Sequence, residues 1–251
     1  MRTTILAKLR ELEAQQHIKI LYACESGSRA WGFASPDSDF DVRFIYARRA
    51  DDYLSIAEVR DVIELPINEI LDIGGWDIKK ALKLFLKSNA PLYEWLQSPI
   101  IYFKDDDFVS ELHSLMPKYF SPRAGANHYL SMAINTVEND LQKNEVKLKK
   151  YFYALRPILA CKWIIDKQEC PPMEFGILRT LITEIELQTS IDDLLESKSK
   201  SDEKALISKI PMMDAWLVRT IEECKIGVLA FEPEKHTVEE LNTVFRKYIQ
   251  K

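Results

Sequence analysis

An apolar stretch, a glycine turn and a pair of carboxylates follow one another between residues 18 and 46. The run IKILYAC at 18–24 has the length and composition of a buried strand, and the pair Gly27-Ser28 after it marks a turn. In residues 39–46 apolar side chains alternate with Asp39, Asp41 and Arg43, which predicts a second strand. A period of two places both aspartates on one face of the sheet and the apolar side chains on the other. The stretch therefore predicts a sheet that presents two neighbouring carboxylates beside a glycine turn.

Two such carboxylates repel each other unless a cation lies between them. Oxygen ligands of this kind suit Mg²⁺, which commonly enters a site together with the phosphates of a nucleotide. Gly27 permits close approach to its backbone, and its position directly after the buried strand favours a phosphate-binding turn over a simple one. Arg29 fits a phosphate contact as well as it fits an exposed surface position. We interpret the pattern as a metal-dependent phosphoryl or nucleotidyl transfer site, with ordinary surface carboxylates as the alternative.

A third carboxylate is expected within residues 60–74, which read as two strands around Pro66-Ile67-Asn68. Asp72 is flanked by Leu71 and Ile73 in the second of these strands. Glu64, in the first strand, is the alternative. Asp77 then stands at the N-cap position of an amphipathic helix predicted over 78–87.

The amino-acid sequence resembles that of a known superfamily. Gly27-Ser28 followed by Asp39-x-Asp41 is similar to the motif of the DNA polymerase β-like nucleotidyltransferases. The ordered blocks from about Ile18 to Trp163, including GSRAWGFASPDSDFDVRFIY, LDIGGWDIKKALKLFLKSNAPLYEWLQSPIIY, KYFSPRA and KLKKYFYALRPILACKW, resemble a family of bacterial predicted nucleotidyltransferases. Some members of that family are proposed to act in RNA repair beside an RNA ligase.

The resemblance implies an α/β (α+β) fold. We expect a polymerase-β-like palm domain with a mixed sheet in residues 1–105 and a helical domain in residues 106–251 that closes the nucleotide cleft. The resemblance also matches Asp72 to the carboxylate that other members of the superfamily supply from a neighbouring strand.

The segment KLKKYFYALRP at 147–157 predicts a basic and aromatic helical face. Lys149, Tyr153 and Arg156 are spaced by four and three residues, so that they share one side of a helix, and Lys150 can substitute for Lys149. A solvent-exposed basic stripe is the alternative interpretation. The apolar run that follows favours a face that binds a triphosphate and a stacked base.

The remaining chain reads as mostly helical. Besides an opening helix at 3–16, a strand at 99–103 and a polar loop at 196–204, we predict helices at 92–96, 106–116, 123–143, 144–167, 174–188, 203–224 with a break at Pro211, and 238–250. The formal net charge of −5 argues against a generally basic nucleic-acid binder. Four cysteines without metal-type spacing and no membrane-length apolar run lead us to expect a soluble cytoplasmic protein.

Together these observations predict an Mg²⁺-dependent nucleotidyltransferase. Two Mg²⁺ ions would be held by Asp39, Asp41 and Asp72, and attack of an acceptor hydroxyl on the α-phosphorus of a nucleoside triphosphate would release pyrophosphate. The expected ligands of the nucleotide are Gly27, Ser28, Arg29, Lys149, Tyr153 and Arg156. RNA is the acceptor that the resemblance favours. The alternatives are a protein hydroxyl, a small molecule such as an aminoglycoside, and a nucleotide-binding protein without catalysis.

Overall fold

A computed structural model describes residues 1–66 and 70–250, and the chain forms two compact units. The sheet unit comprises Met1–Gly27, Asp39–Phe120 and Lys235–Lys251, and the helical unit comprises Ser28–Ser38 and Ser121–Glu234. The chain thus leaves the sheet unit after Gly27 and re-enters it at Asp39. The expected domains were 1–105 and 106–251. In the structure, residues 28–38 belong to the helical unit, and residues 106–120 and 235–251 belong to the sheet unit.

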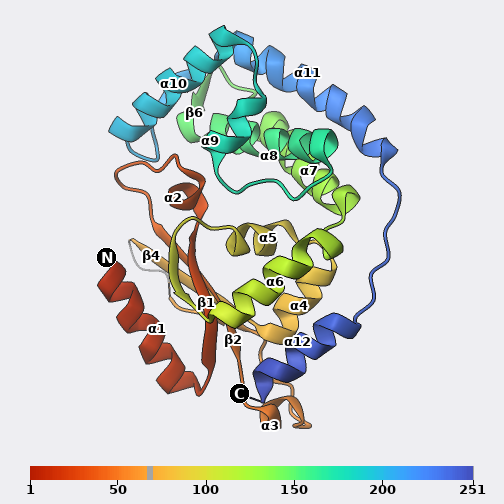
Figure 1. Cartoon of the computed structure of the whole chain (residues 1–251). Helices are drawn as coiled ribbons and strands as arrows, with labels where there is room; N and C mark the ends of the chain where they lie inside the picture. The colour runs from red at the N-terminus through yellow and green to blue at the C-terminus, as the bar shows by residue number, and fades with distance from the viewer. Residues whose placement is uncertain (67–69, 251) are drawn as a thin grey trace. The chain divides into compact units, whose positions relative to one another are not determined.

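The sheet unit is built on a mixed five-stranded sheet (Figure 1). Its strand order is β3-β4-β2-β1-β5, where β2 and β4 are parallel and the other pairs are antiparallel. The strands are β1 (Lys19–Ser26), β2 (Phe40–Ala47), β3 (Val62–Glu64), β4 (Leu71–Asp77) and β5 (Ile101–Lys104). The predicted strands and the mixed α/β fold are therefore confirmed; Ile67 and Asn68 of the predicted turn lie outside the described residues.

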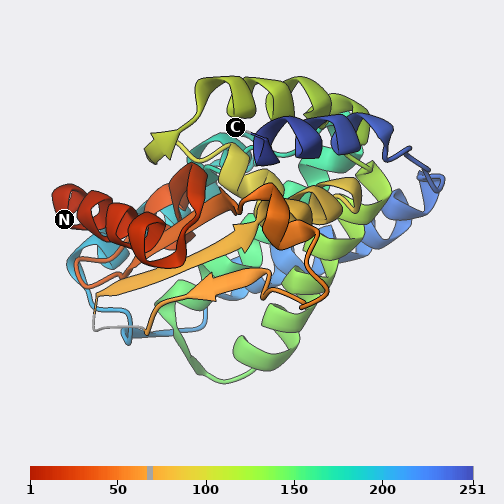
Figure 2. The same ribbon diagram turned by 90° about the horizontal axis from the view of Figure 1, so that it is seen from below.

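Alternation along β2 gives the two faces of this sheet different partners. On one face, apolar side chains of the strands bury against helix α1 (Arg2–Gln16), which runs alongside the sheet (Figure 2). The contributing residues include Ile5, Leu9, Leu12, Val42, Phe44, Tyr46 and Ile73. On the other face, Trp76 of β4 stacks on Trp95 of helix α5 (Ala90–Leu96), with ring centroids 3.9 Å apart. The polar residues of β2 share this second face.

Helix α4 (Ile78–Leu86) begins where the sequence predicts. The Asp77 side chain accepts a hydrogen bond from the backbone N–H of Lys79, which satisfies one of the free amides of the first turn. Ala81, Leu82 and Phe85 are buried at the spacing of one helical face. The sheet unit also contains α3 (Ala50–Tyr53), α6 (Asp106–Tyr119) and α12 (Glu239–Ile249).

The helical unit is organised around α8 (Leu148–Lys167). Phe33, from the short excursion of the chain at 28–38, stacks on Phe152 with ring centroids 4.9 Å apart and meets Phe175 edge-on. These aromatic contacts explain why residues 28–38 belong to this unit. Its other elements are α2 (Gly27–Trp31), which starts at the unit boundary, α7 (Pro122–Asp140), β6 (Glu145–Lys147), α9 (Phe175–Leu178), η1 (Arg179–Leu181), α10 (Ile185–Lys200), β7 (Leu206–Ser208), α11 (Pro211–Gly227) and η2 (Val228–Ala230).

The helix expected at 144–167 begins at Leu148, after the strand β6, and the one expected at 174–188 is divided into α9, η1 and the start of α10. Two further predicted elements of the helical unit are wrong. The helix expected at 203–224 starts only at Pro211, since residues 206–208 form β7 and pair with β6 from 60 positions earlier in the chain. Pro211 fits the first turn of a helix because that position needs no N–H donor. The polar loop expected at 196–204 is helical as far as Lys200. In both cases partners distant in sequence decide the structure, and local composition does not contain them.

Within residues 1–66 and 70–250, none of the helices combines the length and the apolar character that crossing a bilayer requires.

Candidate active site

Gly27 lies at the end of β1 in a conformation that favours glycine. Its φ is +63°, and a Cβ atom added there would lie 2.1 Å from Oδ2 of Asp41. Any side chain at this position would therefore displace the Asp41 carboxylate as well as strain the backbone. The group that approaches this glycine is a carboxylate of the protein itself, and its expected contact with a phosphate stays a prediction.

Asp41 and Asp72 lie side by side on adjacent parallel strands. They are direct register partners of β2 and β4, and their side chains are 30% and 29% exposed. Nη2 of Arg43 lies 3.3 Å from Oδ1 of Asp41 and 2.6 Å from Oδ2 of Asp72. Because both carboxylates reach one nitrogen, they converge on the position of a single cation. In this structure that positive charge comes from the chain.

The Glu25 side chain fixes the position of the backbone at the start of β2. Its carboxylate is fully buried and accepts hydrogen bonds from the backbone N–H of Asp41, at 2.8 Å, and from the hydroxyl of Tyr102. The Ser98 hydroxyl donates to the Glu25 carbonyl at 2.6 Å. A buried carboxylate is stable only with such donors. The position of Asp41 is thus set by both its strand and the Glu25 side chain.

The remaining candidate carboxylates are placed less closely. Asp39 is exposed and precedes β2, two residues before Asp41. Glu64 is exposed on β3 opposite Gly74, two residues further along β4 from Asp72. Among the residues that the structure describes, no three or more His, Cys, Asp or Glu side chains are already arranged to hold a metal ion. Asp41 and Asp72 nevertheless fit a divalent cation, since their hard oxygen donors converge on one point.

The helical unit holds a second polar cluster, formed by Ser28, Ser38, Lys149, Lys198 and Glu203 and called here the Glu203 cluster. The hydroxyl of Ser28 donates to that of Ser38 at 3.1 Å, and Ser38 donates to Oε1 of Glu203 at 2.7 Å. Lys149 lies 2.7 Å from Oε2 of Glu203 and Lys198 lies 3.4 Å from Oε1. A single carboxylate therefore binds two lysines and a serine next to the start of α2.

The ionisation of this cluster reflects burial and pairing. Burial opposes the charge of Glu203, but the hydrogen bonds from Lys149 and Ser38 and the nearby lysine charges outweigh it and lower the pKa of Glu203 to about 2. Burial lowers the pKa of Lys198 more than Glu203 raises it. The pKa of Lys149 is raised, because its hydrogen bond and charge attraction to Glu203 outweigh its burial.

The other predicted nucleotide ligands have partners within the helical unit. Arg29 donates to the Ser38 carbonyl at 2.5 Å. Arg156 is 3% exposed, donates to the Met173 carbonyl, and places its guanidinium 4.5 Å from the centroid of the Trp31 ring. Tyr153 meets the same ring edge-on at 6.0 Å. The structure thus joins the predicted helical face to the excursion at 28–38, and the roles of these residues toward a nucleotide stay predictions.

Lys150, the predicted substitute for Lys149, has a different partner. It pairs with Asp140 at 2.8 Å. Lys149 is therefore the member of the pair that belongs to the Glu203 cluster.

Sequence reasoning missed several of these polar residues. Alternation already placed Arg43 on the face of Asp41, but not as the counter-charge of the pair. A signal for Glu25 exists too, because a carboxylate directly follows an apolar run. Nothing local singles out Lys198 or Glu203, which lie more than 150 residues after Ser38 in a polar stretch.

Comparison with known protein families identifies the family of the chain. The model of the RNA repair pathway DNA polymerase beta family matches residues 1–247. The uncharacterized protein YcgL of Bacillus subtilis (strain 168) is 43% identical over 252 residues, which cover 100% of this chain and 97% of that protein. A nucleotidyltransferase-like protein from Exiguobacterium sibiricum aligns in structure with a TM-score of 0.30 and 11% identity, over 98% of this chain and 78% of its own. The chain belongs to the RNA repair pathway DNA polymerase beta family and is a polymerase β-like nucleotidyltransferase.

Proposed function

We propose that the protein transfers a nucleoside monophosphate from a nucleoside triphosphate to a hydroxyl of RNA in an Mg²⁺-dependent reaction. The oxygen of the acceptor hydroxyl forms a bond to the α-phosphorus, the bond from that phosphorus to the bridging oxygen breaks, and pyrophosphate leaves. The acceptor proton passes to solvent. Membership of an RNA repair family supports RNA as the acceptor.

The observation that carries the proposal is the convergence of Asp41 and Asp72 on one cationic position beside Gly27. Asp41 and Asp72, with Asp39, would hold the divalent metal. Bound there, Mg²⁺ stabilises charge on the transferring phosphoryl group and lowers the pKa of the acceptor hydroxyl. Arg43 must exchange its contacts with the two carboxylates when the metal binds. Glu25 and Gly27 keep the Asp41 carboxylate in place.

The Glu203 cluster is suited to phosphate oxygens. Its lysines and serine hydroxyls are donors that already surround an anionic group of the protein. We propose that Ser28, Arg29 and Lys149 donate to the nucleotide's phosphates, which takes over the contacts that Glu203 now makes. Lys198 is an additional candidate ligand.

The test is incubation with each α-³²P-labelled nucleoside triphosphate, Mg²⁺ and a pool of small RNAs, resolved on one gel. Wild type should label RNA, and Asp41→Asn and Asp72→Asn should each lower the rate at least about 100-fold, since a metal ligand is lost. Glu64→Gln is the matched control and should label RNA at the wild-type rate. Equal labelling by wild type and Asp41→Asn would contradict the site assignment.

The same gel separates the alternatives. Label on protein would replace the RNA acceptor with a protein hydroxyl. Label on an added aminoglycoside would indicate a small-molecule acceptor. Nucleotide binding by wild type without any label transfer, in a cell extract as well as with RNA, would indicate a nucleotide-binding protein without catalysis.

A further inference from the structure

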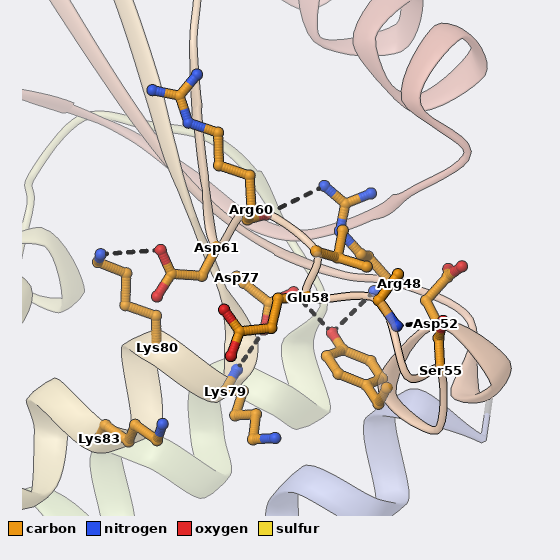
Figure 3. A pocket seen from close by; sticks show the side chains of 13 residues that line it. Arg48, Asp52, Ser55, Glu58, Arg60, Asp61, Asp77, Lys79, Lys80 and Lys83 are labelled. Carbon is orange, nitrogen blue, oxygen red and sulfur yellow. Dashed lines mark hydrogen bonds and ion pairs between the residues drawn. The ribbon is translucent and has the colours of Figure 1, made fainter.

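A cavity of about 750 Å³ lies in the sheet unit at the other end of the strands that carry Asp41 and Asp72 (Figure 3). Arg48, directly after β2, and Asp77, the last residue of β4, both line it. Seven residues separate Asp41 from Arg48, which corresponds to roughly 23 Å of strand at about 3.3 Å per residue. The cavity, called here the basic pocket, is therefore distinct from the candidate active site.

The lining of the basic pocket combines five cations with four carboxylates. The cations are Arg48, Arg60, Lys79, Lys80 and Lys83, and the carboxylates are Asp52, Glu58, Asp61 and Asp77. Figure 3 shows Lys79, Lys80 and Lys83 on one side, on helix α4, and Arg48 with Asp52 on the other. A simple count of charges leaves only a small positive excess, so the contacts of each group decide what the pocket can bind.

Three of the four carboxylates are engaged in holding the fold. Asp77 caps α4 through the N–H of Lys79 at 2.8 Å and accepts a hydrogen bond from the Tyr53 hydroxyl at 2.8 Å. Asp61 pairs with Lys80 at 3.1 Å. Asp52 accepts a hydrogen bond from the backbone N–H of Arg49 at 3.2 Å, at the start of α3. These three carboxylates therefore have structural partners, and the charge of Asp77 in addition attracts Arg48.

Lys79 and Lys83 present two exposed ammonium groups one helical turn apart on α4. Burial is greater at Arg48, whose guanidinium lies 5.4 Å from the centroid of the Tyr46 ring. Its Nε is buried and has no hydrogen-bond partner among the described residues. A buried donor without an acceptor is costly, and an anionic oxygen from a ligand would satisfy it. Arg60 is exposed, as Lys79 and Lys83 are, and is the fourth cation of the pocket that has not been paired above.

We propose that the basic pocket binds phosphodiester groups of the RNA acceptor, several nucleotides away from the end that reacts at Asp41 and Asp72. The proposal rests on the proposed function for the identity of the ligand. Donors on both arginine and lysine side chains fit phosphate oxygens, and exposed Leu54, Ile56 and Val59 before β3 offer apolar surface to unstacked bases. The protein as a whole is acidic, so a local basic site is where an RNA strand would be retained.

The distance between the two sites predicts a length dependence. Roughly 23 Å of strand corresponds to about seven nucleotides at about 3.4 Å each. An RNA that is long enough reaches both the basic pocket and the carboxylates. A short RNA that occupies the carboxylate end does not reach the lysines of α4.

The experiment is fluorescence anisotropy of end-labelled single-stranded RNA, of 4 and of 15 nucleotides, without nucleotide or metal. For the 15-mer, Lys79→Ala/Lys83→Ala should bind about tenfold more weakly than wild type. The slope of log K against log salt should fall by about 1.4, or about 0.7 per lost phosphate contact on a single strand. Lys8→Ala/Arg10→Ala is the matched control on α1, and its Kd should stay within about twofold of wild type. The 4-mer can occupy the basic pocket by itself, so Lys79→Ala/Lys83→Ala should also weaken its binding, whereas the α1 control should not.

Equal affinity of wild type and Lys79→Ala/Lys83→Ala for the 15-mer would overturn the proposal. An unchanged Kd of the 4-mer in Lys79→Ala/Lys83→Ala would contradict a phosphodiester site in the basic pocket. Because the measurement contains no triphosphate, it stands even if the transfer reaction fails, so the two failures are distinguishable.

Discussion

In the sheet unit an arginine, Arg43, bridges two carboxylates, whereas in the helical unit a carboxylate, Glu203, bridges two lysines. The carboxylates of Asp41 and Asp72 are held by adjacent strands and by the backbone contact with Gly27. The Glu203 cluster depends instead on long side chains and on residues far apart in the sequence. One arrangement is fixed by backbone geometry and the other by side-chain pairing.

The comparison shows that each unit supplies the opposite charge that its own cluster requires. Like charges held close together destabilise a folded chain unless they are paired. On the proposed function, a divalent cation replaces the charge of Arg43 in the sheet unit, and phosphate groups replace the charge of Glu203 in the helical unit. A ligand that carries only one of these charges replaces the counter-charge of only one cluster. Three variants test this comparison.

The largest effect is expected for Gly27→Ala. The new Cβ meets the Asp41 carboxylate and the positive φ is unfavourable for alanine, so both the site and the fold should suffer. We expect a loss of about 1–3 kcal/mol in the free energy of unfolding, measured in urea, and at least about a 100-fold lower rate of nucleotidyl transfer.

Gly32→Ala is the matched control for this variant. Gly32 has a φ of +90°, but nothing lies within 4 Å of the Cβ that would be added there. It should therefore lose stability through backbone strain alone and keep the transfer rate. A Gly27→Ala protein as active as Gly32→Ala would show that the position of the Asp41 carboxylate is not decisive.

Arg43→Gln should produce an intermediate effect, on metal binding. Without the guanidinium, Asp41 and Asp72 face each other without a counter-charge, so a divalent cation no longer competes with Arg43. Titration calorimetry with Mn²⁺ should show binding that is about tenfold tighter, equivalent to about 1.4 kcal/mol. The unfolding midpoint should fall without metal and recover when metal is added.

Arg43→Lys retains the charge and should bind Mn²⁺ much as wild type does. Weaker Mn²⁺ binding by Arg43→Gln than by Arg43→Lys would break the comparison, because Arg43 would then support the metal instead of competing with it.

The two regions also differ in how far the sequence predicts them. Period-two alternation in β2 and β4 and the Gly-Ser turn are local patterns, and they placed Asp41 and Asp72 each on a strand, with Gly27 near Asp41. The family resemblance matched Asp72 to a neighbouring strand, and in the structure the two residues are register partners. Register and face are properties of the backbone, which local sequence encodes well.

The Glu203 cluster could not be predicted in this way. Lys149 was a candidate from its helical face, but its partner lies in a polar stretch that looked like a mobile loop. The pairing arises because β7 is paired with β6 just before α8, a contact between segments far apart in the chain. Long-range side-chain contacts of this kind leave no periodic signal in the sequence.

The smallest effect is expected for Glu203→Gln, which keeps the shape of the side chain and removes its charge. Lys149 and Lys198 then lose the charge of Glu203. Tripolyphosphate should therefore bind two- to tenfold more tightly, which corresponds to a change in binding free energy of about 1 kcal/mol. The measurement is calorimetry at neutral pH and low salt. Glu196→Gln is the control, because it removes an exposed carboxylate that pairs with Lys200 one turn away.

Acid unfolding provides a second reading of the same variant. Because the folded pKa of Glu203, about 2, lies below its ordinary value of 4.5, its ionisation stabilises the fold above pH 4.5. That contribution is lost as the pH falls from 4.5 to about 2, when the carboxylate takes up a proton. The difference in urea midpoint between wild type and Glu203→Gln should therefore be greatest at neutral pH and should shrink toward about pH 3. A constant difference would mean that the charge of Glu203 does not hold the lysines, and the symmetry between the two units would fail on the helical side.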